Sequence, residues 1–583
     1  MSNPGSKGLW PELNPIIRKG FRERLRPKQM IAWGLCTLIV TSFLYLTTYL
    51  NTTESIGNQF FGATKADGAK KAFPVLLGIQ VFILMFLGTG RLAAGTAEER
   101  ETGLLDYQRM TPMRPSAKIV GYLFGLPARE YFMFALTLPF LVHAIIVGEL
   151  AVSKVLLLYI VFLSCVLLYH LTAHVTGLIV SKPRAAAWVS RVVVLGLYVL
   201  LPILGRAGFS FLSFLTLRPT YYGTMQEELE KSWEDRMLQE QWDNSERYEY
   251  SQRMAEFWKE VPFFEIELSA SLFTILMQGL LFAALFATAH RKWQSENLPA
   301  FSKTFGIGLF AVIQFFLLGS LWQLYGNGEA SRLLGWGISR VDNRQFVENP
   351  LVVLIIVQTI LFTFSLVVAA LILHVTCPTR HQYLKGRRRA AKLGLPDIPF
   401  AADEKPGWMV VLCLALIMPI THFLLLAHAA SSRIYFMRTP EIEAFVLPCL
   451  LFAMCLVYLR AAREKWFTVG FWGFLGLLWI TPLLVAMVMA AGWRDDAVFA
   501  VFHVGSLSPP FAFFEIAVFT QEPHLLADVG LGKSKLLQCT MFGLVVAGFI
   551  AILMSISQYR LRQRWNEREK RVETKEEGKA NEA

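Results

Sequence analysis

The sequence predicts an all-α membrane protein with about twelve membrane-spanning helices, arranged as two sets of six. Apolar stretches of about twenty residues, the length that crosses a bilayer as a helix, recur along the 583 residues. The composition is 54% hydrophobic and only 17% charged, which leaves too little polar surface for a soluble protein of this size. The net charge of +12 arises from Lys and Arg beside the apolar stretches, as in membrane flanks, and this excludes nucleic acid as the expected partner.

The expected spans follow one another along the whole chain. Their approximate limits are 30–50, 74–93, 122–147, 155–180, 188–205, 267–289, 304–326, 350–376, 407–427, 442–460, 467–492 and 536–557. With the N-terminus inside, Lys and Arg concentrate in the inner loops, so the positive-inside rule places both termini in the cytoplasm. The expected location is the cell membrane, as a multi-pass protein of a bacterial inner membrane.

The spans divide the chain into four parts. These are a cytoplasmic N-terminal helix (1–29), a first half (30–292), a second half (293–557) and a charged cytoplasmic tail (558–583). Four long connections interrupt the halves: an inner turn at 94–118, an outer loop at 206–262, a basic inner loop at 377–406 and an outer segment at 493–535.

The N-terminal part predicts an interfacial helix. Ile17, Phe21 and Leu25 repeat every four residues and share one helix face. Basic residues surround this face: Arg18, Lys19, Arg22 and Arg26. Such a helix lies on an anionic leaflet, although an ordinary polar flank of the first span is the alternative.

The stretch from Arg91 to Tyr122 is the most informative part of the chain. It carries acids and bases that cannot enter hydrocarbon at low cost, so it is a polar turn between two spans. Residues 98–110 are expected to form a helix with acids in its first turn, where the helix dipole favours them. Pro112 and Pro115 then end the helix.

The turn resembles the ABC-2 type permeases of ABC transporters. Their pattern is close to E-R-E-x-G-T-L-E-L-L-L-x-T-P-L, followed by Gly-Lys at the next helix. This chain has Glu99-Arg100-Glu101-Thr102-Gly103-Leu104-Leu105-Asp106, then Met110-Thr111-Pro112-Met113, then Gly121-Tyr122. It departs from the pattern at Leu104, at Tyr107-Gln108-Arg109 and at Tyr122, which replaces the Lys.

The resemblance implies that 94–118 is a coupling helix that docks on an ATP-binding subunit. The residues expected to carry this role are Glu98, Glu99, Arg100, Glu101, Gly103, Leu105, Asp106, Thr111 and Pro112. It also implies a permease subunit of an ATP-driven exporter, with two copies of the ATPase or their equivalent. The chain itself would be no enzyme and hold no cofactor, since ATP and Mg²⁺ would bind to the partner. Gly532-Lys533-Ser534 is no Walker A sequence, because Ala527 occupies the position of its first glycine.

Each half ends with a short apolar outer stretch that stops at proline and is too short to span. The first stops at Pro219 and the second contains Ser508 and Pro509, which predicts two re-entrant helices like those of ABC-2 permeases. The outer loop at 221–262 is rich in acids, with aromatic and apolar residues at helical spacing. One or two amphipathic helices are expected there, either capping the spans or forming a gate or a surface for a periplasmic or accessory partner.

The second half has a basic loop where the first half has its acidic turn. Arg387, Arg388 and Arg389 mark it, and it is either a second docking loop or an electrostatic anchor on anionic membrane lipids.

His170 and His174 are four residues apart on one face of the fourth span. Ionisable groups within a membrane are candidates for function, so this pair could hold a metal or haem or relay protons. Two ligands are too few for a complete metal site, and neutral histidines that form hydrogen bonds across the bundle are the alternative. The seven cysteines show no C-x-x-C spacing and are expected to be buried and unpaired.

Two other functions remain open at this stage. An ion-driven secondary transporter with twelve spans would need polar or charged residues at mid-span and broken helices, and acids at mid-span are scarce here. A polytopic enzyme or assembly factor would have to use His170 and His174.

Overall fold

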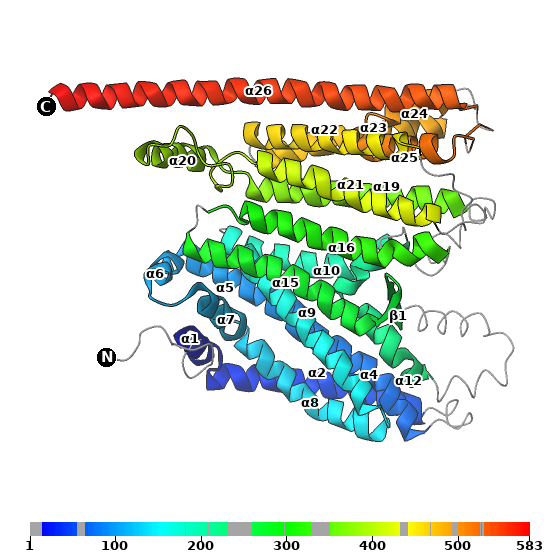
Figure 1. The fold of residues 1–583 in the computed structure, drawn as a ribbon. Helices are drawn as coiled ribbons and strands as arrows, with labels where there is room; N and C mark the ends of the chain where they lie inside the picture. The colour runs from blue at the N-terminus through cyan, green and yellow to red at the C-terminus, as the bar shows by residue number, and fades with distance from the viewer. Residues whose placement is uncertain are drawn as a thin grey trace. The chain divides into compact units, whose positions relative to one another are not determined.

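A computed structural model describes most of the chain. The described residues are 14–54, 64–180, 182–206, 210–230, 259–295, 298–327, 350–431, 441–466, 468–492, 498–524, 526–527 and 530–582. They form two compact units (Figure 1). Unit 1 comprises Met1–Pro262 and Ile266–Leu298, and unit 2 comprises Phe263–Glu265 and Pro299–Ala583. The boundary after Leu298 lies close to the expected division at 292–293.

The described part of the chain confirms the all-α prediction, and its strands are the two of a single hairpin. Eleven of its helices are long and apolar enough to cross a membrane. The remaining expected span, 188–205, lies within α10, a 24-residue helix that is not among those eleven.

Unit 1 holds the first six expected spans. Its helices are α1 (Pro15–Arg24), α2 (Pro27–Glu54), α4 (Lys65–Val81), η1 (Phe82–Gly88), α5 (Thr89–Glu101), α6 (Leu104–Met110), α7 (Pro115–Gly125), α8 (Ala128–Val147), α9 (Val152–Ile179), α10 (Pro183–Arg206), η2 (Ser210–Leu215), α11 (Arg218–Thr220), η3 (Tyr221–Met225), α12 (Gln226–Glu230) and α15 (Ala270–Gln294). The strands β1 (Glu260–Phe263) and β2 (Ile266–Ser269) precede α15.

Two expected spans of unit 1 have different limits in the structure. The span placed at 74–93 belongs to one continuous helix, Lys65–Glu101, that passes through the π-helical segment η1. The span placed at 122–147 is broken between α7 and α8, where Pro127 provides no amide hydrogen to continue α7. Apolar composition continues through both places, so it did not reveal either feature.

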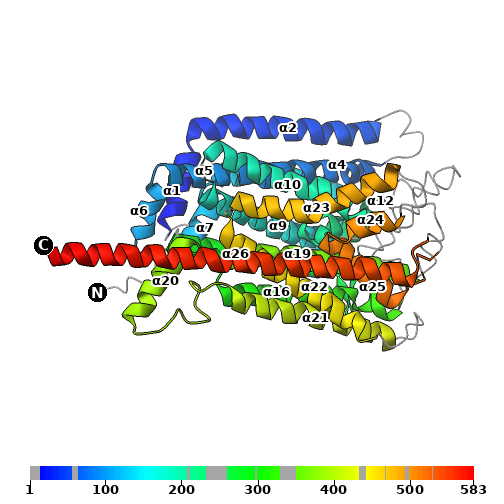
Figure 2. The ribbon, with the colours of Figure 1, turned by 90° about the horizontal axis from the view of Figure 1, so that it is seen from above.

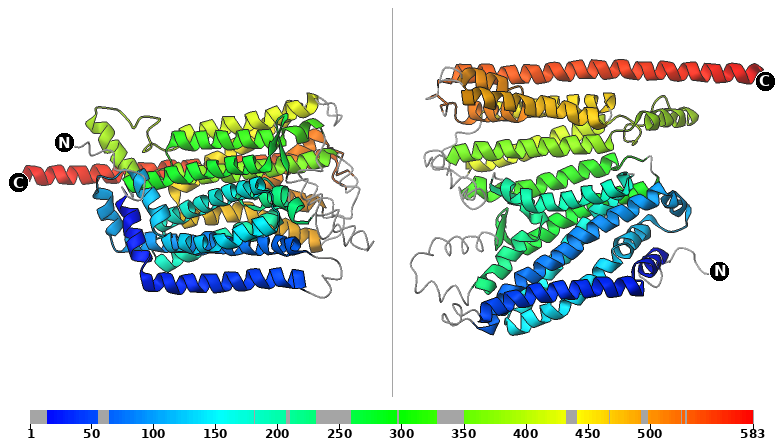
Figure 3. Two further views of the ribbon diagram at one scale, coloured as in Figure 1. Left: turned by 90° about the horizontal axis from the view of Figure 1, so that it is seen from below. Right: turned by 180° about the vertical axis from the view of Figure 1, so that it is seen from behind.

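The elements of unit 1 differ between its two ends. The helices α1, α6 and α7 gather at one end, and α12 and the hairpin lie at the other (Figure 1). Figures 2 and 3 show α1 lying across the direction of the long helices. The end with α1, α6 and α7 is called the turn end below.

Unit 2 holds the other six expected spans. Its helices are α16 (Lys303–Asn327), α19 (Pro350–Thr376), α20 (Arg380–Lys392), α21 (Trp408–Ser431), α22 (Glu443–Lys465), α23 (Thr468–Gly492), α24 (Val498–Gly505), α25 (Pro509–Gln521) and α26 (Lys533–Glu582). The last span and the tail form one helix of 50 residues, which extends past the other helices of its unit (Figure 1). The tail thus continues as a helix to Glu582.

Both short outer stretches form pairs of short elements. In unit 1, η2 is followed by the single helical turn α11, which contains the buried Pro219. In unit 2, α24 and α25 meet at Ser508, whose hydroxyl donates a 2.7 Å hydrogen bond to the carbonyl of Trp479. Pro509 then starts α25, as the fixed φ of proline favours at a first helical position. None of these elements is long enough to span a bilayer.

The outer loop of the first half is only partly described. Residues 231–258, which contain most of the expected amphipathic helices, lie outside the described residues. Residues 221–230 form η3 and α12, and the loop returns to α15 as the hairpin β1–β2. The sequence predicted loop or helix for the segment that leads back to α15, and the hairpin corrects this prediction.

Candidate functional site

The polar turn of unit 1 is two helices rather than one. The expected helix at 98–110 is interrupted, because α5 continues through Glu98 and Glu99 to Glu101 and α6 starts at Leu104. Gly103 connects them with φ of 74°, a left-handed conformation that strongly favours glycine. The acids therefore lie in the last turn of α5, where the helix dipole disfavours them, and they need positively charged or donor partners.

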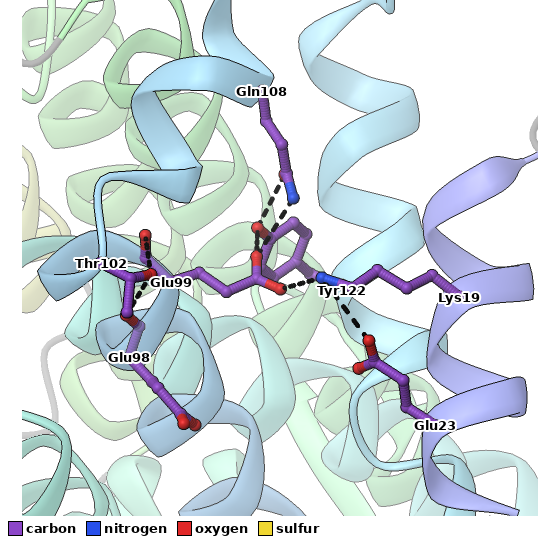
Figure 4. A network of polar contacts seen from close by, with 7 residues as sticks. All are labelled: Lys19, Glu23, Glu98, Glu99, Thr102, Gln108 and Tyr122. Carbon is purple, nitrogen blue, oxygen red and sulfur yellow. Dashed lines mark hydrogen bonds and ion pairs between the residues drawn. The ribbon is translucent and has the colours of Figure 1, made fainter.

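Glu99 has such partners on three other helices (Figure 4). Lys19 Nζ of α1 lies 2.9 Å from Glu99 Oε1, and Gln108 Nε2 of α6 donates to Oε2 at 3.2 Å. The Tyr122 hydroxyl of α7 also donates to Oε2, and it lies 2.8 Å from Gln108 Oε1. We call Lys19, Glu99, Gln108 and Tyr122 the Glu99 cluster. It joins four helices of the turn end through one carboxylate.

Tyr122 occupies the centre of this end of the unit. Its side chain is fully buried, and its ring centroid lies 5.0 Å from His174 of α9 and 5.2 Å from Trp293 of α15. Burial first, and then the Glu99 carboxylate, raise the pKa of the Tyr122 phenol well above its usual range. The phenol therefore remains a donor to Glu99. At the position where the ABC-2 pattern has Lys, this chain uses Tyr122, and Lys19 of α1 provides the positive charge.

The helix α1 is bound to α7 by backbone contact and a capping side chain. Asn14 accepts from the amide of Ile16 at 3.1 Å and donates through Nδ2 to the carbonyl of Ala117 at 2.8 Å. A Cβ on Gly20 would lie 2.3 Å from the carbonyl oxygen of Gly125, so the helices touch where both lack side chains. Of the three apolar residues expected to share a lipid-facing side of this helix, Ile17 is buried within the protein and Phe21 is exposed.

Replacing Gly20 by Ala is expected to separate α1 from α7. The added methyl group would overlap the Gly125 carbonyl, and overpacking of this kind costs about 1–3 kcal/mol. The measurement is the thermal unfolding midpoint of the full chain in nanodiscs. Gly78→Ala is the matched control, because a Cβ there meets nothing within 4 Å. An unchanged midpoint for Gly20→Ala would contradict the close contact.

The opposite side of the turn is exposed. Glu98 and Glu101 are exposed and Asp106, which forms a 2.5 Å ion pair with Arg109, is 68% exposed. Two large side chains lie beside these acids, Tyr107 at 65% and Met110 at 78% exposure. Figure 4 shows the Glu98 side chain directed away from the Glu99 cluster. We call Glu98, Glu101, Asp106, Tyr107 and Met110 the acidic face.

The other residues expected in the turn hold it together. Arg100 Nη1 donates to the carbonyl of Ile179 at 2.6 Å, which connects α5 to the end of α9. Leu105 is buried, and Thr111 donates to the carbonyl of Gln108 at 2.7 Å. Pro112 is exposed just after α6. These residues shape the turn, whereas the exposed acids are its outward-facing charges.

His174 belongs to the same end of unit 1. Trp293 Nε1–H donates to His174 Nε2 at 2.9 Å, so Nε2 carries no proton. The other ring nitrogen, Nδ1, lies 3.2 Å from the Thr96 hydroxyl of α5. The ring is therefore a neutral Nδ1–H tautomer that joins α5, α9 and α15.

His170, one turn earlier on α9, has the opposite tautomer. Its Nε2 lies 3.0 Å from the Leu84 carbonyl, which can only accept, so Nε2 carries the proton. Its Nδ1 accepts from the Tyr131 hydroxyl at 2.9 Å. All four ring nitrogens of the pair are thus engaged with protein groups. No group of three or more potential metal ligands occurs within the described ranges, and the geometry favours the hydrogen-bonding alternative.

The basic loop of unit 2 forms a helix, α20, which begins with a capping box from Thr379 and Gln382. Arg387 faces α26, where its Nη1 donates to Asn566 Oδ1 at 2.5 Å. Arg388 and Arg389 are exposed. The three arginines therefore do not form one exposed basic patch, because Arg387 connects α20 to the extension of α26.

Sequence reasoning missed four residues of the turn end: Lys19, Gln108, Tyr122 and Trp293. Lys19 was grouped with the lipid-facing basic residues, and Gln108 and Tyr122 were noted only as departures from a pattern. The available signal was that Gln108 and Tyr122 are polar residues at positions where the ABC-2 pattern has an apolar and a charged residue.

The fold and the turn together define a polytopic membrane protein with a polar turn braced at one end of unit 1. The family model of the ABC-2 type transporter matches residues 12–223. This range includes α1, all four residues of the Glu99 cluster and the acidic face. Over this range the chain is similar to the ABC-2 type transporter membrane family. Residues 224–583 lie outside the match. No curated protein and no solved structure matches the chain.

Proposed function

We propose that this chain is the permease subunit of an ATP-driven exporter whose energy comes from a separate ATP-binding subunit docked on the acidic face. The observation that carries the proposal is the division of the turn into two sides. The Glu99 cluster braces the inner side, while Glu98, Glu101 and Asp106 remain exposed beside Tyr107 and Met110. Exposed aromatic and Met side chains with charges at their rim are features of protein interfaces.

The hydrogen bonds of the Glu99 cluster support the transmission of movement between helices. A displacement of α6 would move α5 and α7 as well, because Gln108, Glu99 and Tyr122 are directly hydrogen-bonded to one another. From Tyr122 the contacts continue to His174 and Trp293, which belong to long helices of the bundle. In our proposal, ATP binding closes the partner ATPases and moves the turn, and the braced helices move with it. ATP and Mg²⁺ bind in the partner.

The proposal extends to orientation and copy number. The turn end of unit 1 would face the cytoplasm, with both termini on that side and the re-entrant segments facing outward, in a bacterial inner membrane. The Lys and Arg bias of the loops supports this orientation. Two ATPase copies or their equivalent would serve the two units, the second near α20. The twelve-span arrangement would then act as a fused pair of six-span halves.

Reversing two charges of the acidic face tests this docking site. In Glu98→Lys with Glu101→Lys, the ATP-hydrolysing activity that remains bound to the affinity-purified full chain is expected to fall about tenfold, which corresponds to about 1.4 kcal/mol of lost docking energy. Both side chains are exposed, so the fold should be retained. The readout is Mg²⁺-dependent ATP hydrolysis by the complex purified from native membranes.

The matched control is Glu260→Lys with Glu267→Lys. It makes the same charge change at two exposed residues of the hairpin, at the other end of unit 1. The control should retain wild-type activity. Equal activity in both variants would remove the docking role from the acidic face.

A further inference from the structure

A buried glutamate in unit 2 takes no part in the proposed coupling. Glu515 lies in the middle of α25, and its side chain is fully buried. Neither of its carboxyl oxygens has a hydrogen-bond partner among the described residues. Its neighbours Ala512, Ile516 and Phe519 on the same helix belong to the apolar core of the unit. The carboxyl group thus lies in an apolar place without a donor.

No described charge compensates this carboxyl group. The helices α19, α22, α23 and α26 pack against α25, and α23 carries no titratable side chain. From α21, the ring of His422 lies 5.8 Å from that of Phe513, and its Nε2 lies 3.2 Å from the carbonyl oxygen of Ala444. From α24, Phe502 contacts Phe511, and the His503 ring stacks on Phe542 of α26. On α26, the thiol of Cys539 is buried and lies near Glu515. On α26, Lys535 donates to the Gly530 carbonyl at 3.2 Å, and Lys533 lies 5.8 Å from the Phe519 ring.

Titratable groups also occur on α19 and α22. In α22, Cys455 and Tyr458 form a hydrogen bond with each other, and Cys449 is half-buried. In α19, His374 lies at the opposite end of the helix from Gln358, the partner of Gln521. The charged residues of α22 are at its two ends: Glu443, Arg460, Arg463, Glu464 and Lys465.

We propose that Glu515 is a proton-binding site that is occupied in the conformation described here. An isolated ionised carboxylate in an apolar place is far more costly than a neutral carboxylic acid, so the group must hold a proton there. Movement of α25 away from α26 would let water reach the carboxyl group. The acid would then give its proton to water and become a carboxylate, and the return of α25 to its place against α26 would take one proton back. The proposal is independent of ATPase docking.

Infrared spectroscopy of the full chain in nanodiscs tests the proposal. At neutral pH, wild type should show the C=O stretching band of a protonated carboxylic acid, and Glu515→Gln should lose it. Glu443→Gln is the matched control, because Glu443 is an exposed carboxylate on a helix that packs against α25. This control should keep the band.

A second measurement covers the case in which Glu515→Gln does not fold. Wild type labelled with ¹³C-glutamate should shift the same band, which identifies its source as a glutamic acid without any substitution. A wild-type spectrum without such a band at neutral pH would overturn the proposal. In that outcome the carboxylate is ionised and paired with a bound cation, and the protein would be stabilised by added Na⁺ or K⁺ in a Glu515-dependent way.

Discussion

Replacing Glu464 by Gln is expected to destabilise unit 2 by about 3–5 kcal/mol, the usual loss when one partner of a buried ion pair is removed. Glu464 is 6% exposed and accepts from Arg562 of α26, through Nε at 2.8 Å and through Nη2 at 2.5 Å. Arg460, one turn before it on α22, lies 3.4 Å away and is 1% exposed. The substitution leaves the Arg460 charge buried without its counter-ion.

The measurement for Glu464→Gln is thermal unfolding of the full chain in nanodiscs, with fluorescence as the readout. Arg460 also lies 3.7 Å from the centroid of the Trp408 ring, so the indole emission should change as well. A combined Arg460→Met and Glu464→Leu variant is the control, because removal of both charges should recover most of the lost stability. If the combined variant is as unstable as Glu464→Gln, packing rather than charge accounts for the effect.

Replacing Glu99 by Ala is expected to lower the stability of unit 1 by about 1.5–3 kcal/mol and to abolish stimulation of the partner ATPase. The energy is that of hydrogen bonds to a charged group. It should be lower than for Glu464, since Lys19 is 39% exposed and water can solvate its ammonium group. Tyr122 and Gln108 would remain hydrogen-bonded to each other, but α5 would lose its connection to both.

Comparison with Glu101→Ala separates bracing from docking. Glu101 is exposed, so this variant should keep its unfolding midpoint and lose only part of the ATPase binding. Glu99→Ala should instead keep the acidic face and lose stability. The two quantities to measure are the midpoint and the amount of ATPase that is retained. If both variants lose ATPase to the same extent with unchanged midpoints, Glu99 contacts the partner directly.

The polar turn could be found from the sequence because its charges are incompatible with hydrocarbon, whereas the function of each acid could not. Glu98, Glu99 and Glu101 look alike along the chain, and only packing makes one internal and two external. The partner of Glu99, Lys19, is 80 positions away in the sequence, and no local pattern connects them. The break at Gly103 likewise depends on the return of the chain toward α7.

The intramembrane histidines show the same limit. Spacing of four residues correctly placed His170 and His174 on one helix face. It could not show that one ring faces Tyr131 and the carbonyl of Leu84, while the other faces Trp293 and Thr96. Those partners come from neighbouring helices. The two histidines therefore lie on one helix face but bind different groups.

The length of α26 has a mechanical consequence. Residues 558–582 continue the last span without a break, and at 1.5 Å per residue they form a rod of about 37 Å. Such a rod acts as a lever arm: a tilt of about 5° at its base displaces its tip by about 3 Å. Arg387 is hydrogen-bonded to Asn566, which lies near the base of this rod. A small displacement of α20 would therefore produce a larger displacement of the tip.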